Sequence, residues 1–286
     1  MKKIALLFYR LTRNFKFKNY PSIKNKILKI LIQNNIKYDI YIHTFSMDNE
    51  HGAKLNNNEF LLLKPKKYII DNQNKIDKLL DFEKYKSLFK KLYPDNTIKN
   101  IARANYSKRQ VWKLLENSNI NYDVLIALRP DVEYLNEISL KHLEIQDNEI
   151  KLPNFSPEIY PLYFINIFSN QKKLNYKKSK QRSVNDRFAI GNFSTIKSYL
   201  NIGKYLLKLE PDNIGETEEN LKSYLDLKKI KITIIFNFYF RRVRSNGEYA
   251  TNSYCVWFPR IFNYEIRLFL FVFYLFFIYN ILNLIY

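Results

Sequence analysis

The order of the first elements, strand then helix then strand, constrains the fold most. Lys3–Tyr9 is almost wholly apolar, which is typical of a strand buried on both faces of a sheet. Pro21 stands where a helix can begin, and apolar residues then recur at helical spacing from Ile23 to Leu31. A second strand is expected at Tyr38–Phe45. This order predicts the start of a parallel α/β sheet.

A third apolar run ends abruptly in charge. Val124–Leu128 is followed at once by Arg129, Pro130, Asp131 and Glu133. A buried strand that ends in this way delivers its charged groups to the carboxyl edge of the sheet, where open α/β folds bind ligands. This edge is therefore the expected functional site.

Less regular patterns complete the expected organisation. Residues 46–66 are polar and predict a surface loop, and residues 171–182 predict a basic loop. Helices are expected at about 74–92, 105–115, 194–209 and 215–225, and strands at 188–191, 230–236 and 239–243. The fold class is thus α/β, a mostly parallel Rossmann-like sheet flanked by helices. Residues 1–259 are expected to form one domain, and residues 260–286 a hydrophobic C-terminal helix.

The C-terminal tail is uncharged from Leu268 to Tyr286, 19 residues, close to the ~20 that a spanning helix needs. Arg260 and Arg267 precede it, so the positive-inside rule would keep the domain on the cytoplasmic side. We therefore expect a membrane anchor that holds the protein at the cytoplasmic face. The alternative is a core or interfacial helix, because Asn280 and Asn283 weaken a spanning assignment.

The N-terminus resembles a signal peptide superficially, with basic residues before a short apolar run. It lacks a small-residue cleavage site, and Arg10 and Arg13 interrupt it, so a buried strand is the better interpretation. The single cysteine, Cys255, excludes an intramolecular disulfide, and the three histidines have no metal-ligand spacing. These features favour a reducing compartment.

The formal net charge of +20 predicts attraction to anions such as nucleic acid, anionic lipid or nucleotide diphosphates, without choosing among them. Two carboxylates separated by one residue, Asp131 and Glu133, can share a divalent cation, Mg²⁺ or Mn²⁺, which would bridge the phosphates of a nucleotide ligand. An acidic pair at this spacing is also common on ordinary surfaces. Arg129 beside it is a candidate phosphate partner.

Other candidates lie at expected strand ends. Arg10 and Arg13 follow the first strand and could hold phosphates, or be two exposed basic residues among 47. Asp186 precedes an apolar strand and could be a general base, or pair with Arg187. A basic cluster, Arg241, Arg242 and Arg244, could clamp a diphosphate or contact anionic lipid.

Five segments taken in order, KIALLFYRLTRNF, YDIYIHTF, YDVLIALRPDVEYL, NDRFAIGN and RRVRSNG, resemble a family of glycosyltransferases from bacterial surface-polysaccharide loci and large DNA viruses. The resemblance covers roughly residues 2–250 and implies a single-domain enzyme of the GT-A type. It implies a nucleotide-sugar donor held near Arg10 and Arg13, and a glycan or lipid-linked glycan acceptor near Asp186. It also places Arg129, Pro130 and Asp131 where such enzymes carry an Asp-x-Asp motif.

The chain departs from that family at informative positions. Many relatives have a glycine in the first loop, where this chain has Tyr9, Arg10 and Leu11. The second carboxylate is Glu133 instead of aspartate, which puts metal use in question. Two other classes stay open: a basic nucleic-acid-binding protein, opposed by aromatic residues that fall mostly in apolar runs, and an inactive scaffold of the same fold.

Overall fold

A computed structural model describes residues 2–47, 49–50, 53–153, 184–235, 238, 240–249, 271–272 and 274. The chain divides into two compact units, Met1–Ala250 and Thr251–Tyr286. All strands and helices described below belong to the first unit.

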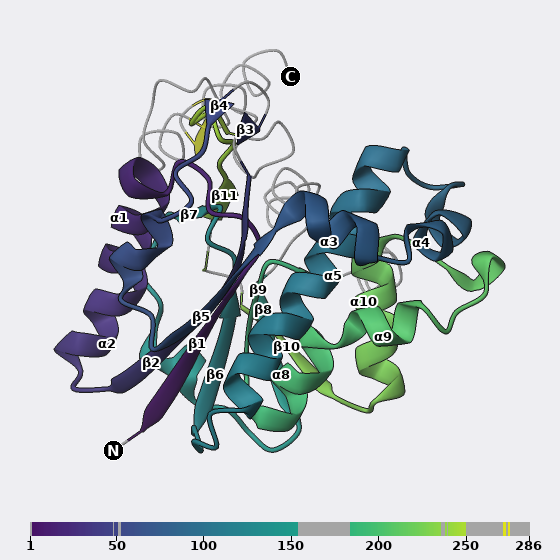
Figure 1. The fold of residues 1–286 in the computed structure, drawn as a ribbon. Coiled ribbons are helices and arrows are strands. Elements are labelled where there is room, and N and C mark those ends of the chain that lie inside the picture. Colours follow the sequence, from purple (N-terminus) through teal and green to yellow (C-terminus); the bar gives the residue numbers. More distant parts are fainter. Residues whose placement is uncertain are drawn as a thin grey trace, which may run out of the picture. The chain divides into compact units, whose positions relative to one another are not determined.

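A mostly parallel, seven-stranded sheet forms the centre of this unit (Figure 1). Its order is β10-β8-β9-β6-β1-β2-β5, and all strands except β9 run in the same direction. The strands are β1 (Lys3–Tyr9), β2 (Lys37–Ser46), β5 (Lys67–Asn72), β6 (Val124–Leu128), β8 (Glu149–Pro153), β9 (Phe188–Gly191) and β10 (Lys231–Ile235).

Helices cover both faces of the sheet (Figure 1). One face carries a nearly continuous helical segment made of η1 (Phe15–Asn19), α1 (Tyr20–Ile23), η2 (Lys24–Leu28) and α2 (Lys29–Gln33). The other carries α5 (Asp95–Glu116) and α8 (Phe193–Leu200), with α3 (Gln73–Leu79), α4 (Phe82–Phe89), α9 (Ile202–Leu206) and α10 (Thr217–Leu227) grouped on that side. There are also short 3-10 turns, η3 (Glu59–Leu63), η4 (Leu140–Leu143) and η5 (Pro211–Asn213), and a short antiparallel pair of strands, β3 (Asn49–Glu50) and β4 (Ala53–Lys54).

The central strands separate two hydrophobic cores, because successive side chains of a strand point to opposite faces. In β1, Ala5, Leu7 and Tyr9 pack with α5 and α8, whereas Ile4, Leu6 and Phe8 pack with the helices of the opposite face. Strands buried on both sides need apolar residues at every position, which explains the unbroken apolar runs of β1 and β6.

Two features enlarge the carboxyl edge of the sheet. The antiparallel β9 begins there, because Phe188 pairs with Leu128 at the end of β6. Beyond the same edge, β7 (Val132–Tyr134) and β11 (Phe240–Arg242) form a small antiparallel sheet. The ends of β1 and β6, the start of β9 and β11 therefore meet in one region.

Most elements expected from the sequence are confirmed, but several boundaries differ. The strands β1, β2, β6, β9, β10 and β11 were all expected, whereas β3, β4, β5, β7 and β8 were not. The helix expected at 74–92 is broken at Leu80–Asp81 into α3 and α4, since Asp81 caps a new helix by accepting from the Lys84 amide. The helix α5 begins ten residues earlier than expected. The expected basic loop at 171–182 lies outside the described residues.

The membrane location predicted from an apolar C-terminal helix is corrected by the structure. Among the residues described, no helix combines the length and the apolar character that crossing a bilayer requires. The longest of them, α5, has 22 residues but carries charged side chains along its length, including Arg103 and Lys108. Most of residues 260–286 lie outside the described part of the chain, and so does the predicted domain boundary at 259.

Candidate active site

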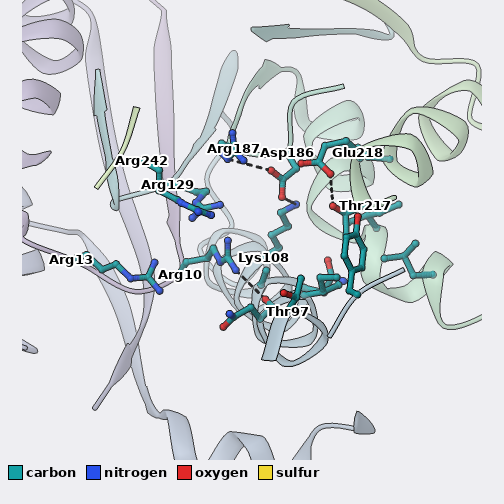
Figure 2. Close-up of a pocket in the computed structure, with 18 of the residues that line it drawn as sticks. Arg10, Arg13, Thr97, Lys108, Arg129, Asp186, Arg187, Thr217, Glu218 and Arg242 are labelled. Carbon is teal, nitrogen blue, oxygen red and sulfur yellow. Dashed lines mark hydrogen bonds and ion pairs between the residues drawn. The ribbon is translucent and has the colours of Figure 1, made fainter. Parts of the chain in front are cut away.

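A cavity of about 340 Å³ opens at the carboxyl edge of the sheet. Its walls come from the loop after β1, from one face of α5, from the start of β9, from α9 and α10, and from β11 (Figure 2). Among the residues that the structure describes, seven cationic side chains line it, together with two carboxylates. The cations are Arg10, Arg13, Lys108, Arg129, Arg187, Arg242 and Arg244, and the carboxylates are Asp186 and Glu218.

Arg10 enters this cavity from an unusual backbone conformation. It has a φ of 86°, which residues other than glycine rarely adopt. Its amide donates to Ser107 Oγ at 2.7 Å, and its Nη2 donates to the carbonyl of Asn100 at 3.0 Å. Both contacts come from α5. The helix therefore holds a strained loop residue that aims a guanidinium into the cavity.

Asp131 is completely buried and lies behind the cavity wall. Arg129 binds it in a bidentate manner, Nε to Oδ1 at 2.8 Å and Nη2 to Oδ2 at 2.6 Å, and Arg13 Nη1 donates to Oδ2 at 2.5 Å. Burial alone would raise the pKa of Asp131, but the two guanidinium groups outweigh it and hold that pKa well below its usual range. The carboxylate thus orients two arginines that themselves line the cavity.

The residues as placed do not fit a metal ion shared by Asp131 and Glu133. Both oxygens of Asp131 already accept from arginines, and Glu133 pairs with Arg241 at 3.1 Å. Within the described part of the chain, no group of three His, Cys, Asp or Glu side chains is arranged to hold a metal. Use of Mn²⁺ or Mg²⁺ stays a prediction.

Lys108 of α5 is buried in the cavity wall, with 3% of its surface exposed. Its ammonium lies 5.5 Å and 5.0 Å from the ring centres of Tyr9 and Tyr199, and 4.0 Å from the carboxylate of Asp186. Burial lowers its pKa to about 8, with further lowering by neighbouring arginines and a partial offset by Asp186. Lys108 therefore provides a desolvated cation that an anionic ligand would stabilise.

The two carboxylates of the cavity have different environments (Figure 2). Asp186 lies 3.9 Å from Arg187 Nε as well as 4.0 Å from Lys108. Burial would raise its pKa, but these cations outweigh burial and lower it to about 2. Burial raises the pKa of Glu218, and the nearby charge of Asp186 raises it further. One group is thus a stable anion and the other a more basic carboxylate.

Among the described residues of the cavity, cations outnumber anions, and the repulsion between the cations contributes to lowering the pKa values of two arginines. Burial and the Arg129 guanidinium lower the pKa of Arg10 to about 9 and that of Arg242 to about 10. The buried Arg242 Nε has no hydrogen-bond partner among the described residues. A ligand with several negative charges would relieve this repulsion and satisfy that donor.

The sequence-predicted residues are only partly brought together. Four of them, Arg10, Arg13, Arg129 and Asp186, line the cavity. Asp131 lies behind it, and Glu133 is turned to Arg241 on the small sheet. In the basic cluster, Arg242 and Arg244 line the cavity, whereas Arg241 lies over the ring of Tyr249 at 3.8 Å.

Two important cavity residues, Lys108 and Glu218, were not singled out from the sequence. A signal existed for Lys108, because Thr97, Ile101, Ala104 and Lys108 recur at helical spacing on α5 and all line the cavity. No local pattern marks Glu218, which stands among the acidic residues that normally begin a helix.

Fold and cavity together define a three-layer α/β protein with a pocket suited to a multiply charged small anion. No protein-family model matches the chain. A DNA ligase 4 from Dictyostelium discoideum is 24% identical over 168 residues, which are 58% of this chain and 14% of the ligase. The chain therefore spans only a small part of that protein.

Two solved structures resemble the fold distantly. They are mouse xyloside xylosyltransferase 1, with 10% identity over 82% of this chain and 84% of that one at a TM-score of 0.40, and the mannosyltransferase Ktr4p from S. cerevisiae, with 14% identity over 84% and 70% at 0.37.

Proposed function

We propose that this protein is a glycosyltransferase that moves a sugar from a nucleotide-sugar donor to a glycan acceptor. The observation that carries the proposal is the cavity itself: a cluster of arginines and a lysine beside two carboxylates, at the carboxyl edge of a mostly parallel sheet. Ligands of open α/β folds bind at this edge. The ordered sequence resemblance described above supports the same class of enzyme.

The diphosphate of the donor would lie among Arg10, Arg129 and Arg242. Guanidinium groups match phosphate oxygens in geometry and stay charged, so they bind the substrate and stabilise the charge that grows on the departing diphosphate. Lys108 of α5 adds a buried, compact cation to the same cavity. Because these cations are already desolvated, their attraction to the leaving group is stronger than it would be in water.

The size of the cavity favours a small-molecule ligand over a polynucleotide. Its volume of about 340 Å³ falls within the range of roughly 300–1,000 Å³ that is usual for small-molecule sites. A nucleic acid needs an extended basic groove with exposed aromatic platforms. Tyr93, which lines this cavity, is half-buried, and Tyr9 and Tyr199, which lie beside Lys108, are fully buried, so none of these three rings is an exposed platform.

Thermal unfolding with uridine, guanosine, cytidine and adenosine diphosphates tests the proposal. At a concentration 100 times its Kd, a ligand selective for the native state adds about 2.7 kcal/mol of stability, which raises Tm by roughly 5–10 °C in a domain of this size. We expect such a shift for at least one diphosphate, in EDTA as well as in Mn²⁺. A shift that requires Mn²⁺ would instead support the predicted metal site.

Arg242→Ala and Arg241→Ala form a matched pair for this measurement. The two arginines are adjacent in β11, but only Arg242 lines the cavity, and Arg241 pairs with Glu133. We expect Arg242→Ala to weaken diphosphate binding by about 10- to 100-fold, the usual value of a hydrogen bond to a charged group. Arg241→Ala should bind like the wild type. Equal binding by all three proteins, or no shift with any diphosphate, would refute the proposed function.

A further inference from the structure

The cavity has two chemically different walls. The arginines come from the loops after β1 and β6, the start of β9, and β11. The facing wall comes from α5, α9 and α10, and apart from the charged Lys108 and Glu218 the residues that it contributes are neutral. Its residues include Thr97, Ile101, Leu206, Thr217 and Leu221. Alternating hydroxyl and apolar groups of this kind suit a ligand that has hydroxyls and no charge.

Glu218 marks the boundary between the two walls (Figure 2). It lies in the first turn of α10, and its carbonyl accepts from the Val184 amide at 3.2 Å. This bond ties α10 to the segment that carries Asp186. The Glu218 carboxylate accepts from Thr217 Oγ1 at 2.5 Å, which fixes its direction. The position of Glu218 is therefore determined by both the helix and the segment that leads into β9.

The other carboxylate of the cavity is poorly suited to accept a proton. Asp186 is held by Lys108 and Arg187, and its pKa of about 2 makes it a weak base. Glu218 has a raised pKa and the oxygen basicity that a general base needs. Paired carboxylates with separated pKa values often divide the work of catalysis in this manner.

We infer that the wall formed by α5, α9 and α10 is the subsite for a neutral, hydroxyl-bearing acceptor, and that Glu218 accepts the proton of its reacting hydroxyl. This inference rests on the proposed function and adds to it the chemical class of the acceptor and a second site residue. Asp186 then acts through its negative charge, which keeps Glu218 basic.

The step balances without a further reactant. The acceptor oxygen forms a bond to the anomeric carbon of the donor while its proton passes to the carboxylate of Glu218. The bond from that carbon to the diphosphate oxygen breaks, and its electron pair stays on the diphosphate. The arginines of the opposite wall stabilise the charge that appears there.

Four titratable groups surround Glu218 and set the pH at which it ionises. Asp186 and Arg187 approach from the start of β9, Lys108 from α5, and Tyr93 from the segment between α4 and α5. Asp186 raises the pKa of Glu218, and Arg187 lowers it. Removing the charge of Asp186 must therefore lower the pKa of Glu218 and extend activity to lower pH.

The test uses the full chain with uridine and guanosine diphosphate sugars as donors and 4-nitrophenyl glycosides as acceptors, neutral or carrying a uronic acid. We expect Glu218→Gln to lose about 10²- to 10⁴-fold in transfer rate, the usual contribution of a general base. Its thermal shift with nucleoside diphosphate should match the wild type, which also shows that it folds. Glu219→Gln on the next residue should transfer normally, because glutamine preserves the capping box with Glu216.

A pH profile provides the second readout. The variant Asp186→Asn keeps Glu218 but removes the neighbouring negative charge. The acidic limb of its pH–rate profile for sugar transfer should therefore move to lower pH. The inference is overturned if Glu218→Gln transfers within fivefold of the wild type, if Asp186→Asn abolishes transfer at every pH, or if uronic-acid acceptors are preferred. In each of these cases the wild type still binds nucleoside diphosphate and transfers sugar. Absence of both activities from the wild type would instead refute the proposed function.

Discussion

The backbone at Arg10 adopts a conformation that favours glycine, although the residue there is arginine. The family that the chain resembles often has glycine in this loop, and glycine adopts a positive φ without steric cost. This chain has arginine there at a φ of 86°. Strain of this kind persists where the surroundings fix it, here through Ser107 and Asn100 of α5. The guanidinium at the cavity is the functional gain that would offset the strain.

Two substitutions at Arg10 separate strain from charge. Arg10→Gly and Arg10→Ala both remove the guanidinium, so each should weaken binding of nucleoside diphosphate by about tenfold or more. Only the glycine variant relieves the positive φ. We expect it to be about 1–2 kcal/mol more stable than the alanine variant, which is the usual cost of a left-handed conformation for residues with a Cβ. Urea unfolding measures the difference, and equal stabilities would show that the loop has relaxed.

The sequence located Asp131 at the correct strand end but could not indicate its partners. Its neighbour Arg129 was identified as a candidate phosphate ligand, and it does line the cavity. Arg13, 118 residues away, reaches the same carboxylate only after β1 and β6 pair. Long-range ion pairs of this kind depend on sheet order, which a local pattern does not encode.

Strand direction explains both the success and the limit of the prediction at the level of elements. The apolar run that became β9 was expected, and so was a functional carboxylate before it. The sequence could not indicate that β9 is antiparallel to β6, with Phe188 beside Leu128. That reversal brings the N-terminal end of β9, with Asp186 and Arg187, to the edge where the parallel strands end. The strands β5 and β8 were missed because their residues are more polar.

Asn192, which follows the C-terminal end of β9, can be substituted to change the stability of the fold without changing a residue that lines the cavity. Asn192 caps α8 by accepting from the Thr195 amide at 3.0 Å, next to Gly191, which pairs with Leu125 near the start of β6. Asn192→Ala should destabilise the fold by about 1 kcal/mol, and Asn192→Ser should stay close to the wild type because serine caps equally well. Denaturant unfolding checks this order. Nucleoside diphosphate affinity should be the same in all three proteins, and a weakened affinity would contradict the separation of cap and cavity.

On the scale of the whole molecule, the charge of +20 has two components with different physical consequences. Most lysines of the described residues are half-buried or exposed, and salt screens their attraction to any polyanion. The cavity cations Lys108 and Arg129 are almost fully buried, with 3% and 2% of their surfaces exposed. Buried charges are screened much less than surface charges. Salt dependence can therefore distinguish a small anion in the cavity from a polynucleotide on the surface.

We predict different salt responses for the two kinds of ligand. Between 50 mM and 200 mM salt, the affinity for nucleoside diphosphate should fall by less than about tenfold, because few charges are involved and the cations that face them are buried. A polynucleotide that contacts 6–10 phosphates would lose roughly 10³- to 10⁵-fold over the same range. Fluorescence anisotropy with a labelled diphosphate and a labelled single-stranded oligonucleotide measures both. If the oligonucleotide displaces the diphosphate, and the two affinities fall with equal steepness, the cavity belongs to a nucleic-acid surface. If the two ligands bind independently and their affinities fall with different steepness as salt increases, the arginines at the carboxyl edge of the sheet form the specific site. The remaining positive charge would then contribute only to solubility and nonspecific attraction.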